Sequence, residues 1–256
     1  MPQRFAGGHA RDVRVWLPPS YELPTARARR YPVIVFLHGW PGSEGNWPGQ
    51  GRAGETLGRL IANGQVPELI GVFPDGAGSG LLGRSIWLDS WDGRSRLETF
   101  LVRDLPAWLD SVYRTRATPS HRGVIGLSDG GMGAFNLVIR HPEVYGAAGA
   151  HSADFLLTTD FSDKGLLGPE PGASRMRADY SPLLTVVHAA ARLDNTALYV
   201  DCGMQDESLP QNRAFHARLD SLGVAHTYHE FPGSHDWAYW RTHLEESLKT
   251  VTARMR

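Results

Sequence analysis

Cysteine is almost absent from this chain, because Cys202 is the only one among its 256 residues. A single thiol cannot form an internal disulfide, and it cannot supply several ligands to a metal ion. The sequence therefore excludes a disulfide framework and any metal site built from several cysteines.

Excess charge and long apolar runs are lacking as well. The formal net charge is -1 and the isoelectric point is about 6.8, so we expect no surface that binds nucleic acid or an anionic membrane. No apolar run approaches the ~20 residues of a membrane-spanning helix, and residues 1–9 contain no apolar signal core. We therefore expect a cytoplasmic protein with neither a nucleic acid nor a membrane as partner. The sequence does not predict its oligomeric state.

Short apolar runs alternate with segments of helical periodicity along the chain. Runs rich in branched residues predict strands that are buried on both faces, and the periodic segments predict helices between them. The expected strands cover 13–17, 31–38, 69–73, 124–127, 145–150, 197–201 and 226–231, and the expected helices cover 55–62, 99–113, 212–222 and 237–253, with one more directly after residue 128. This order predicts a single α/β domain, residues 1–256, with a doubly wound and mostly parallel sheet.

One long segment, residues 152–195, departs from the alternation. It is rich in proline, glycine and charge and has no clear periodicity, apart from a short helix expected at 183–192. Long segments of this kind inside compact domains are often functional. We therefore expect residues 152–195 to be a small cap or lid insertion.

The most informative stretch contains the pattern G-x-S-x-G at residues 126–130, between a predicted strand and a predicted helix. This context is typical of a nucleophile elbow. A serine in so sharp a turn has strained backbone angles, and glycine two residues away on either side leaves room for neighbouring elements. The turn exposes the hydroxyl at the positive end of the following helix. We therefore expect Ser128 to be a nucleophile.

A serine hydroxyl needs a base, and the base needs an acid that orients it. In a fold of this order both follow the serine along the chain, with the acid first. His235 stands in a tight turn after the last strand, and Asp206 stands in the loop after the strand at 197–201. We predict that His235 is the base and Asp206 the acid, with Asp201 and Glu207 as alternatives for the acid.

An oxyanion hole needs two backbone N–H groups that point to the developing charge. One should come from Asp129, directly after the nucleophile, and the other from Trp40, in the loop after the strand that ends at His38. The Asp129 side chain has two interpretations. Its carboxylate charges the first turn of the helix favourably, or it contacts a polar or cationic part of the substrate.

Aromatic residues and histidines are frequent in the loops expected around this site. They could line a pocket for the acyl or alcohol part of a substrate, although we expect Trp47 and Trp240 to pack loops onto the core. The candidates for substrate binding are His38, Trp87, Trp91, His151 and Trp237.

Together these motifs resemble the putative esterase family, which includes esterase D (S-formylglutathione hydrolase), tributyrin esterases, feruloyl esterases and the mycolyltransferases. The resemblance runs from about Val13 to Leu248 and is most specific at 37–47 and 233–240. It implies the α/β-hydrolase fold, a small-molecule ester as substrate, and no metal or organic cofactor. It also implies the roles given above for Ser128, Asp206, His235, Trp40 and Asp129. The family often has an apolar residue where this chain has Asp129.

The sequence therefore predicts a serine carboxylic ester hydrolase that works through an acyl-enzyme. Two alternatives remain. An acyltransferase would pass the same acyl group to an alcohol instead of water. A non-catalytic member of the fold would have lost a residue of the triad, whereas all three candidates are present here.

Overall fold

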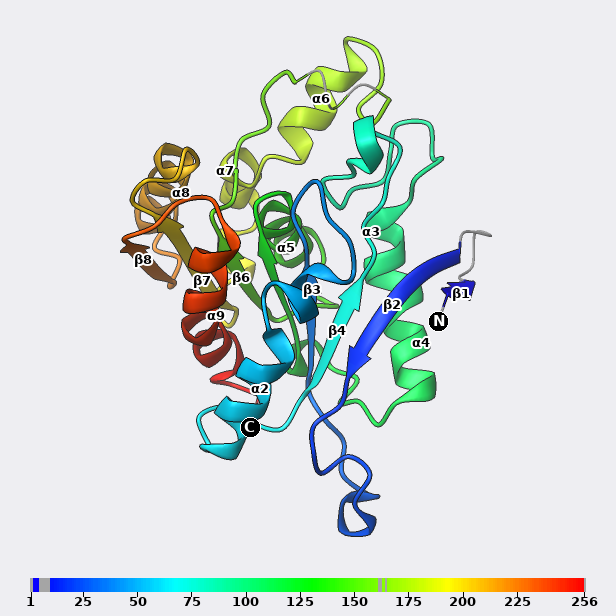
Figure 1. Cartoon of the computed structure of the whole chain (residues 1–256). Coiled ribbons are helices and arrows are strands. Elements are labelled where there is room, and N and C mark those ends of the chain that lie inside the picture. The colour runs from blue at the N-terminus through cyan, green and yellow to red at the C-terminus, as the bar shows by residue number, and fades with distance from the viewer. Residues whose placement is uncertain (1, 5–9, 161–162, 164, 256) are drawn as a thin grey trace.

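In the part of the chain that the structure describes, eight strands form one sheet in the order β1-β2-β4-β3-β5-β6-β7-β8 (Figure 1). The computed structural model describes residues 2–4, 10–160, 163 and 165–255. The strands are β1 (Pro2–Arg4), β2 (Ala10–Trp16), β3 (Val33–Leu37), β4 (Ile70–Pro74), β5 (Arg122–Leu127), β6 (Ala147–His151), β7 (Ala197–Gly203) and β8 (Thr227–Phe231). Strands β3 to β8 all run parallel to one another, whereas β2 is antiparallel to both of its neighbours, β1 and β4.

All seven strands expected from the sequence are present within a few residues. Strand β1 was not expected, since its three residues are Pro-Gln-Arg and show no apolar pattern. Part of the N-terminal segment that argued against a signal sequence, residues 1 and 5–9, lies outside the described residues.

Helices cover both faces of the sheet, so the strands bury side chains on both sides (Figure 1). On β3, Ile34 and Phe36 join one apolar core, while Val33, Val35 and Leu37 join the other, as the two-residue period of a strand requires. The first core holds α2 (Ala53–Ala62) and α9 (Trp237–Thr252), with α1 (Asn46–Gly49) at its edge; the second holds α4 (Leu105–Val112), α5 (Asp129–Arg140) and α8 (Leu209–Ser221). The continuous apolar runs of the central strands follow from this arrangement.

The helix expected at 99–113 is present and contains a π-helical turn. The short helix α3 (Leu97–Thr99) passes through this turn, η3 (Phe100–Asp104), into α4, and the residues at both junctions have right-handed helical backbone angles. Pro106 follows the π-helical turn and has no N–H to donate to the preceding turn. The helix nevertheless continues past this proline to Val112.

Residues 152–195 form short elements that cover the beginning of α5. These are α6 (Gly172–Asp179), α7 (Pro182–Thr185) and the 3₁₀ turns η6 (Val186–His188) and η7 (Ala190–Arg192). The helix expected at 183–192 is thus broken into three pieces. Apolar side chains of this segment form a separate cluster with Ile86, Leu88 and Met132, and Figure 1 shows α6 projecting beyond the rest of the molecule.

Across the described ranges, every helix is too short or too polar to span a lipid bilayer.

Candidate active site

The turn between β5 and α5 holds Ser128 in a strained conformation, with φ 52° and ψ -126°. A Cβ atom added at Gly126 would lie 2.0 Å from the Gly130 oxygen, and one added at Gly130 would lie 2.3 Å from the Leu37 oxygen. Neither site has room for a side chain, because real Cβ atoms do not approach so closely. Packing therefore accounts for both glycines of G-x-S-x-G, and Ser128 stays partly exposed between buried neighbours.

His235 and Asp206 meet beyond the carboxyl ends of β8 and β7. The ring nitrogen Nδ1 of His235 lies 3.0 Å from both carboxylate oxygens of Asp206. Asp206 is buried, and its Oδ1 also accepts a hydrogen bond of 2.8 Å from the Ser208 amide. Because the carboxylate can only accept, Nδ1 carries the proton and Nε2 is free to act as a base.

The two alternatives for the acid are placed differently. Glu207 is exposed. Asp201 is fully buried and binds the Tyr199 hydroxyl at 2.7 Å and Nδ1 of His151 at 2.9 Å. Of the three carboxylates, Asp206 is therefore the one that contacts His235.

Burial and charge act in opposite directions on this pair. Burial lowers the pKa of His235, but the hydrogen bond and negative charge of Asp206 outweigh it, so the pKa is raised above its ordinary value. Burial raises the pKa of Asp206, but His235, the Ser208 amide and Ser152 together bring it below its usual range. The pair therefore favours an ionised Asp206 and a protonated His235 more strongly than the free side chains would.

Ser152 and Trp240 support this pair, and the sequence analysis assigned neither of them a role in the site. Nε1 of Trp240 donates a hydrogen bond of 3.1 Å to the buried Ser152 hydroxyl, which hydrogen-bonds Asp206 in turn. The Trp240 ring meets the His235 ring edge-on at 5.0 Å. Ser152 has φ 49° and directly follows β6 at the carboxyl edge of the sheet, and that position was the only signal available in the sequence.

The loop after β3 lies against the nucleophile. A Cβ atom added at Gly39 would lie 3.0 Å from Cβ of Ser128, so the next residue, Trp40, begins close to the elbow. Within the described ranges, neither the Trp40 amide nor the Asp129 amide donates a hydrogen bond. The Ser128 hydroxyl also has no hydrogen-bond partner among these residues. Its contact with His235 therefore stays a prediction.

The Asp129 carboxylate is bound by Arg84, a residue that the sequence analysis did not single out. Nε and Nη2 of Arg84 lie 2.9 and 3.0 Å from the two carboxylate oxygens, and Nη1 lies 3.0 Å from Asp163 and 3.4 Å from Asp160. The Arg84 and Asp129 side chains are only 11% and 8% exposed. Asp129 stands in the first turn of α5, as the helix interpretation requires. Both of its carboxylate oxygens contact Arg84, so they face a cation of the protein and not one of a substrate.

Asp160 and Asp163 belong to the segment 152–195, so Arg84 also joins this segment to the elbow. The Trp40 ring covers the guanidinium, with Cζ of Arg84 at 5.4 Å from the ring centroid. Burial raises the pKa of Asp163 to about 6, despite the opposing charge of Arg84. One arginine thus holds three carboxylates beside the proposed oxyanion hole.

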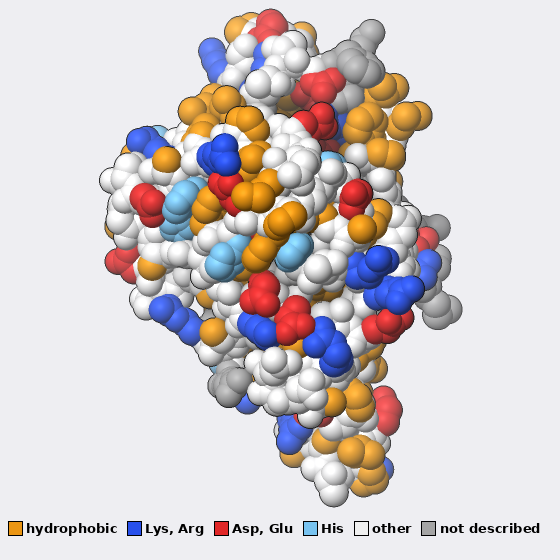
Figure 2. All heavy atoms as spheres, turned by 60° about the vertical axis from the view of Figure 1, so that its left-hand side comes forward, with side chains coloured by type: hydrophobic (Ala, Val, Ile, Leu, Met, Phe, Trp, Pro, Cys, Tyr) orange, Lys and Arg blue, Asp and Glu red, His pale blue; other side chains and the backbone are white. Residues whose placement is uncertain are grey.

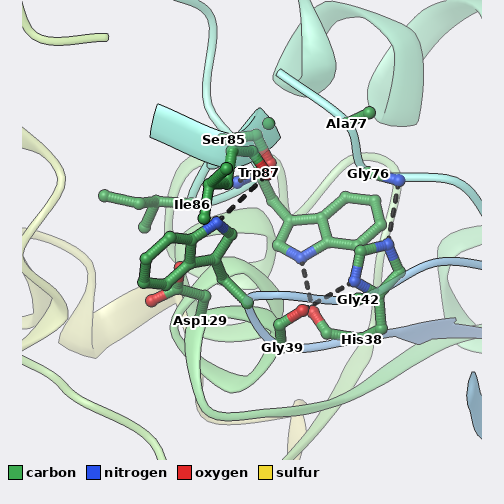
Figure 3. A pocket seen from close by; sticks show the side chains of 12 residues that line it. His38, Gly39, Gly42, Gly76, Ala77, Ser85, Ile86, Trp87 and Asp129 are labelled. Carbon is green, nitrogen blue, oxygen red and sulfur yellow. Dashed lines mark hydrogen bonds between the residues drawn. The ribbon is translucent and has the colours of Figure 1, made fainter. Parts of the chain in front are cut away.

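A pocket opens next to the elbow (Figure 3). His38, Trp40, Trp87 and Asp129 are among the residues that line it. Nε2 of His38 accepts a hydrogen bond of 3.0 Å from the Gly76 amide, and Nε1 of Trp87 donates one of 3.0 Å to the His38 carbonyl. His38 and Trp87 therefore line the pocket while their polar atoms are bonded to the surrounding loops.

Three other candidates for substrate binding lie outside this pocket. His151 is fully buried; its Nδ1 faces Asp201 and its Nε2 lies 2.9 Å from the Ser247 hydroxyl. Both ring nitrogens are thus used inside the protein, so we no longer expect His151 to contact substrate. Its position at a strand end did not reveal that the ring turns toward α9.

Trp91 and Trp237 remain accessible in different ways. Trp91 is 53% exposed and packs against Gly168 of the 152–195 segment. Trp237 is half-buried and meets Trp47 and Trp240 edge-on at 5.5 and 5.2 Å. As expected, Trp47 and Trp240 are buried. Trp237 therefore lies next to the Trp240 ring that contacts His235.

Comparison with known proteins gives consistent results. The family model described as "Putative esterase" matches residues 6–251. An endo-1,4-beta-xylanase/feruloyl esterase of Xylanibacter ruminicola is 31% identical over 160 residues, which are 61% of this chain and 21% of the relative. An esterase of Mycobacterium tuberculosis is 26% identical over 280 residues, which cover 99% of this chain and 58% of the relative. The chain thus spans from about a fifth to three fifths of the length of these relatives.

Solved structures agree with the sequence matches. A ferulic acid esterase superposes with a TM-score of 0.85 at 29% identity and covers 96% of this chain and 94% of its own. An S-formylglutathione hydrolase from Agrobacterium tumefaciens superposes with a TM-score of 0.79 at 19% identity, with 96% and 91% covered. The sheet and its flanking helices are therefore an α/β-hydrolase fold. With the family model spanning nearly the whole chain, this protein belongs to the putative esterase family.

Proposed function

We propose that the protein is a serine carboxylic ester hydrolase in which Ser128, His235 and Asp206 form the catalytic triad. The observation that carries the proposal is the buried Asp206 carboxylate on Nδ1 of His235, at the same edge of the sheet as the strained serine. The carboxyl ends of parallel strands are where such folds bind their ligands. The family membership supports the same conclusion.

The proposed reaction uses each group once in acylation and once in deacylation. The Ser128 hydroxyl attacks the ester carbonyl and gives its proton to Nε2 of His235, while Asp206 stabilises the imidazolium. The Trp40 and Asp129 amides hold the oxyanion. The imidazolium then protonates the leaving alcohol. Water attacks the acyl-enzyme with His235 again as base, which releases the carboxylic acid and restores Ser128.

We propose that the acyl group, aromatic groups included, is the part of the substrate that enters the pocket. The side chains of Trp40, Leu82, Ile86 and Trp87 give it apolar walls. The relatives named feruloyl or ferulic acid esterase support an aromatic acid.

We further propose that residues 152–195 act as a cap on one domain of residues 1–256. The contacts of Asp160 and Asp163 with Arg84 hold this segment beside the pocket. The cytoplasmic location expected from the sequence stays a prediction.

Acyl transfer is the second candidate. It is supported by a relative named diacylglycerol acyltransferase/mycolyltransferase in Mycolicibacterium smegmatis, 27% identical over 183 residues, which are 58% of this chain and 54% of the relative. In a transferase, an alcohol would replace water in the second step. Measuring free acid and transferred ester with increasing alcohol separates the two activities. A constant excess of transferred ester in dilute alcohol would contradict our choice of hydrolase.

The direct test is covalent labelling with a fluorophosphonate, followed by peptide mass spectrometry. We expect one label, on Ser128, and no label or turnover for Ser128→Ala. Ser111→Ala is the matched control, because Ser111 lies on the exposed side of α4. A panel of p-nitrophenyl acetate, butyrate and octanoate with methyl ferulate then defines the acyl group. Undiminished turnover in Ser128→Ala would overturn the proposal.

A further inference from the structure

His216, Asp220 and His226 form a cluster next to the start of β8, whereas the proposed triad lies beyond the carboxyl ends of the strands. His216 and Asp220 are four residues apart on α8, so they project from one face of this helix. His226 directly precedes β8, whereas His235 follows it. The five residues of β8 span about 16 Å. The cluster is therefore separate from the proposed active site, and Figure 2 turns the α8 and β8 side of the molecule forward, where histidine side chains are exposed.

The turn between α8 and β8 fixes the cluster. The Val224 amide donates to the Leu219 carbonyl and the Gly223 amide to the Asp220 carbonyl, at 3.0 Å each. Gly223 has φ 67°. These bonds form a Schellman motif, which reverses the chain and brings His226 back against the helix. Glycine is needed at this position because side chains disfavour such a backbone angle.

The same turn sets the proton position on His226. Nδ1 of His226 lies 2.9 Å from the Val224 carbonyl oxygen, which can only accept, so Nδ1 carries the proton and the lone pair is on Nε2. A histidine that ligates a metal ion characteristically donates its second N–H to a carbonyl or carboxylate in this way. The His226 side chain is only 4% exposed, which restricts its rotation.

The other two groups point to the same place. Nδ1 of His216 lies 2.8 Å from Nε2 of His226 and donates a hydrogen bond to its lone pair, so the lone pair of the His216 ring is on Nε2, which lies 3.5 Å from Asp220 Oδ2. Asp220 Oδ1 lies 4.0 Å from Nε2 of His226. One ligand atom from each residue falls within 4.8 Å of the others. Ligand atoms around tetrahedral zinc lie ~3.3 Å apart, given zinc–ligand distances of ~2.0–2.1 Å. Rotations of the His216 and Asp220 side chains would bring the three ligand atoms to this spacing, and the ion would replace the hydrogen bond between the two imidazoles.

We propose that His216, Asp220 and His226 bind a zinc-like divalent transition metal ion, with one or more waters completing the coordination. Two imidazoles and one carboxylate form a donor set that suits zinc, copper or nickel rather than magnesium or calcium. Stacking of the His216 ring on Tyr228 of β8, at 4.2 Å and 13°, limits the positions of this imidazole. The ion would join α8 to the edge strand β8 and stabilise this edge, without entering the ester chemistry.

The test uses the full chain without a histidine tag, freed of metal by a chelator and titrated with Co²⁺ and then Zn²⁺. We expect one Co²⁺ per chain with tetrahedral d–d absorption bands, displaced by Zn²⁺, and a higher Tm with Zn²⁺. His216→Ala alters a half-buried side chain and Asp220→Asn an exposed one. Each should weaken binding at least tenfold, the lower limit for loss of an outer-shell partner.

The matched control is His188→Ala, an exposed histidine on η6, which should bind Co²⁺ as the wild type does. Esterase activity should be equal with and without zinc for all variants. The proposal is overturned if the wild type shows no tetrahedral Co²⁺ spectrum. It is also overturned if His216→Ala and Asp220→Asn bind Co²⁺ as tightly as the wild type.

Discussion

Arg84 is expected to control catalysis by neutralising the carboxylate next to the oxyanion hole. In Arg84→Gln the Asp129 carboxylate loses the guanidinium that contacts both of its oxygens, while it remains buried. The backbone amide of Asp129 is also a proposed donor to the oxyanion. The unpaired charge therefore opposes the negative charge of the transition state.

The size of the effect follows from Coulomb's law. The carboxylate and the oxyanion contact the same residue, so we place them roughly 7 Å apart; at an effective dielectric constant of about 20 they repel by about 2 kcal/mol. Since each ~1.4 kcal/mol changes a rate tenfold, kcat/KM should fall roughly 30-fold. Asp129→Asn removes the charge itself and should change kcat/KM by less than about threefold, because little remains to repel the oxyanion.

The double variant Arg84→Gln/Asp129→Asn separates electrostatics from disorder. If charge is the cause, the double variant recovers most of the activity lost in Arg84→Gln, although it lacks the ion pair altogether. Rates on p-nitrophenyl acetate are compared with Tm for all four proteins, since leaving one partner of a buried pair also destabilises the fold. A double variant as slow as Arg84→Gln, with Tm restored, refutes this reasoning.

Four further predictions concern the acid–base pair and the elbow. The pKa of His235 is raised, so its imidazole becomes neutral at a pH above the ordinary value of ~6.5. The midpoint of the rising limb of kcat/KM against pH should therefore lie above ~6.5. A midpoint below about 6 would contradict the contact between His235 and Asp206. Asp206→Asn should lower kcat by up to ~10⁴ and move that limb to lower pH, with the exposed Glu207→Gln as control; equal loss in both variants would refute the assignment. Ser152→Ala should raise the pKa of the acid and reduce kcat by roughly tenfold, consistent with the loss of one hydrogen bond to a charged group, while KM stays unchanged; a change confined to KM would argue against a positioning role. Gly130→Ala should unfold or strongly destabilise the protein, since its Cβ would lie 2.3 Å from the Leu37 oxygen, and a Tm equal to that of the wild type would show that the elbow can relax.

The sequence by itself determined the elements that depend on local pattern. Continuous apolar runs such as 33–37 predicted the buried strands, because a strand covered on both faces needs apolar side chains at every position. The G-x-S-x-G turn, with Asp206 and His235 in the expected order, was recognisable because each lies at a strand end. Such features depend on neighbours in the chain, and these are visible in a sequence.

Only the tertiary structure decided which side chains that are distant in the sequence contact one another. Arg84 reaches Asp129 from 45 positions away, and no local pattern couples a loop arginine to a helix N-terminus. His151 is the last residue of β6 and His38 directly follows β3 in the same sheet, yet His151 turns toward Ser247 and α9 while His38 lines the pocket. Neighbouring positions at a strand end face opposite sides, so the direction of each ring depends on register and on the helices packed against it. The sequence thus predicted the groups proposed to react, and packing decided the charges and supports around them.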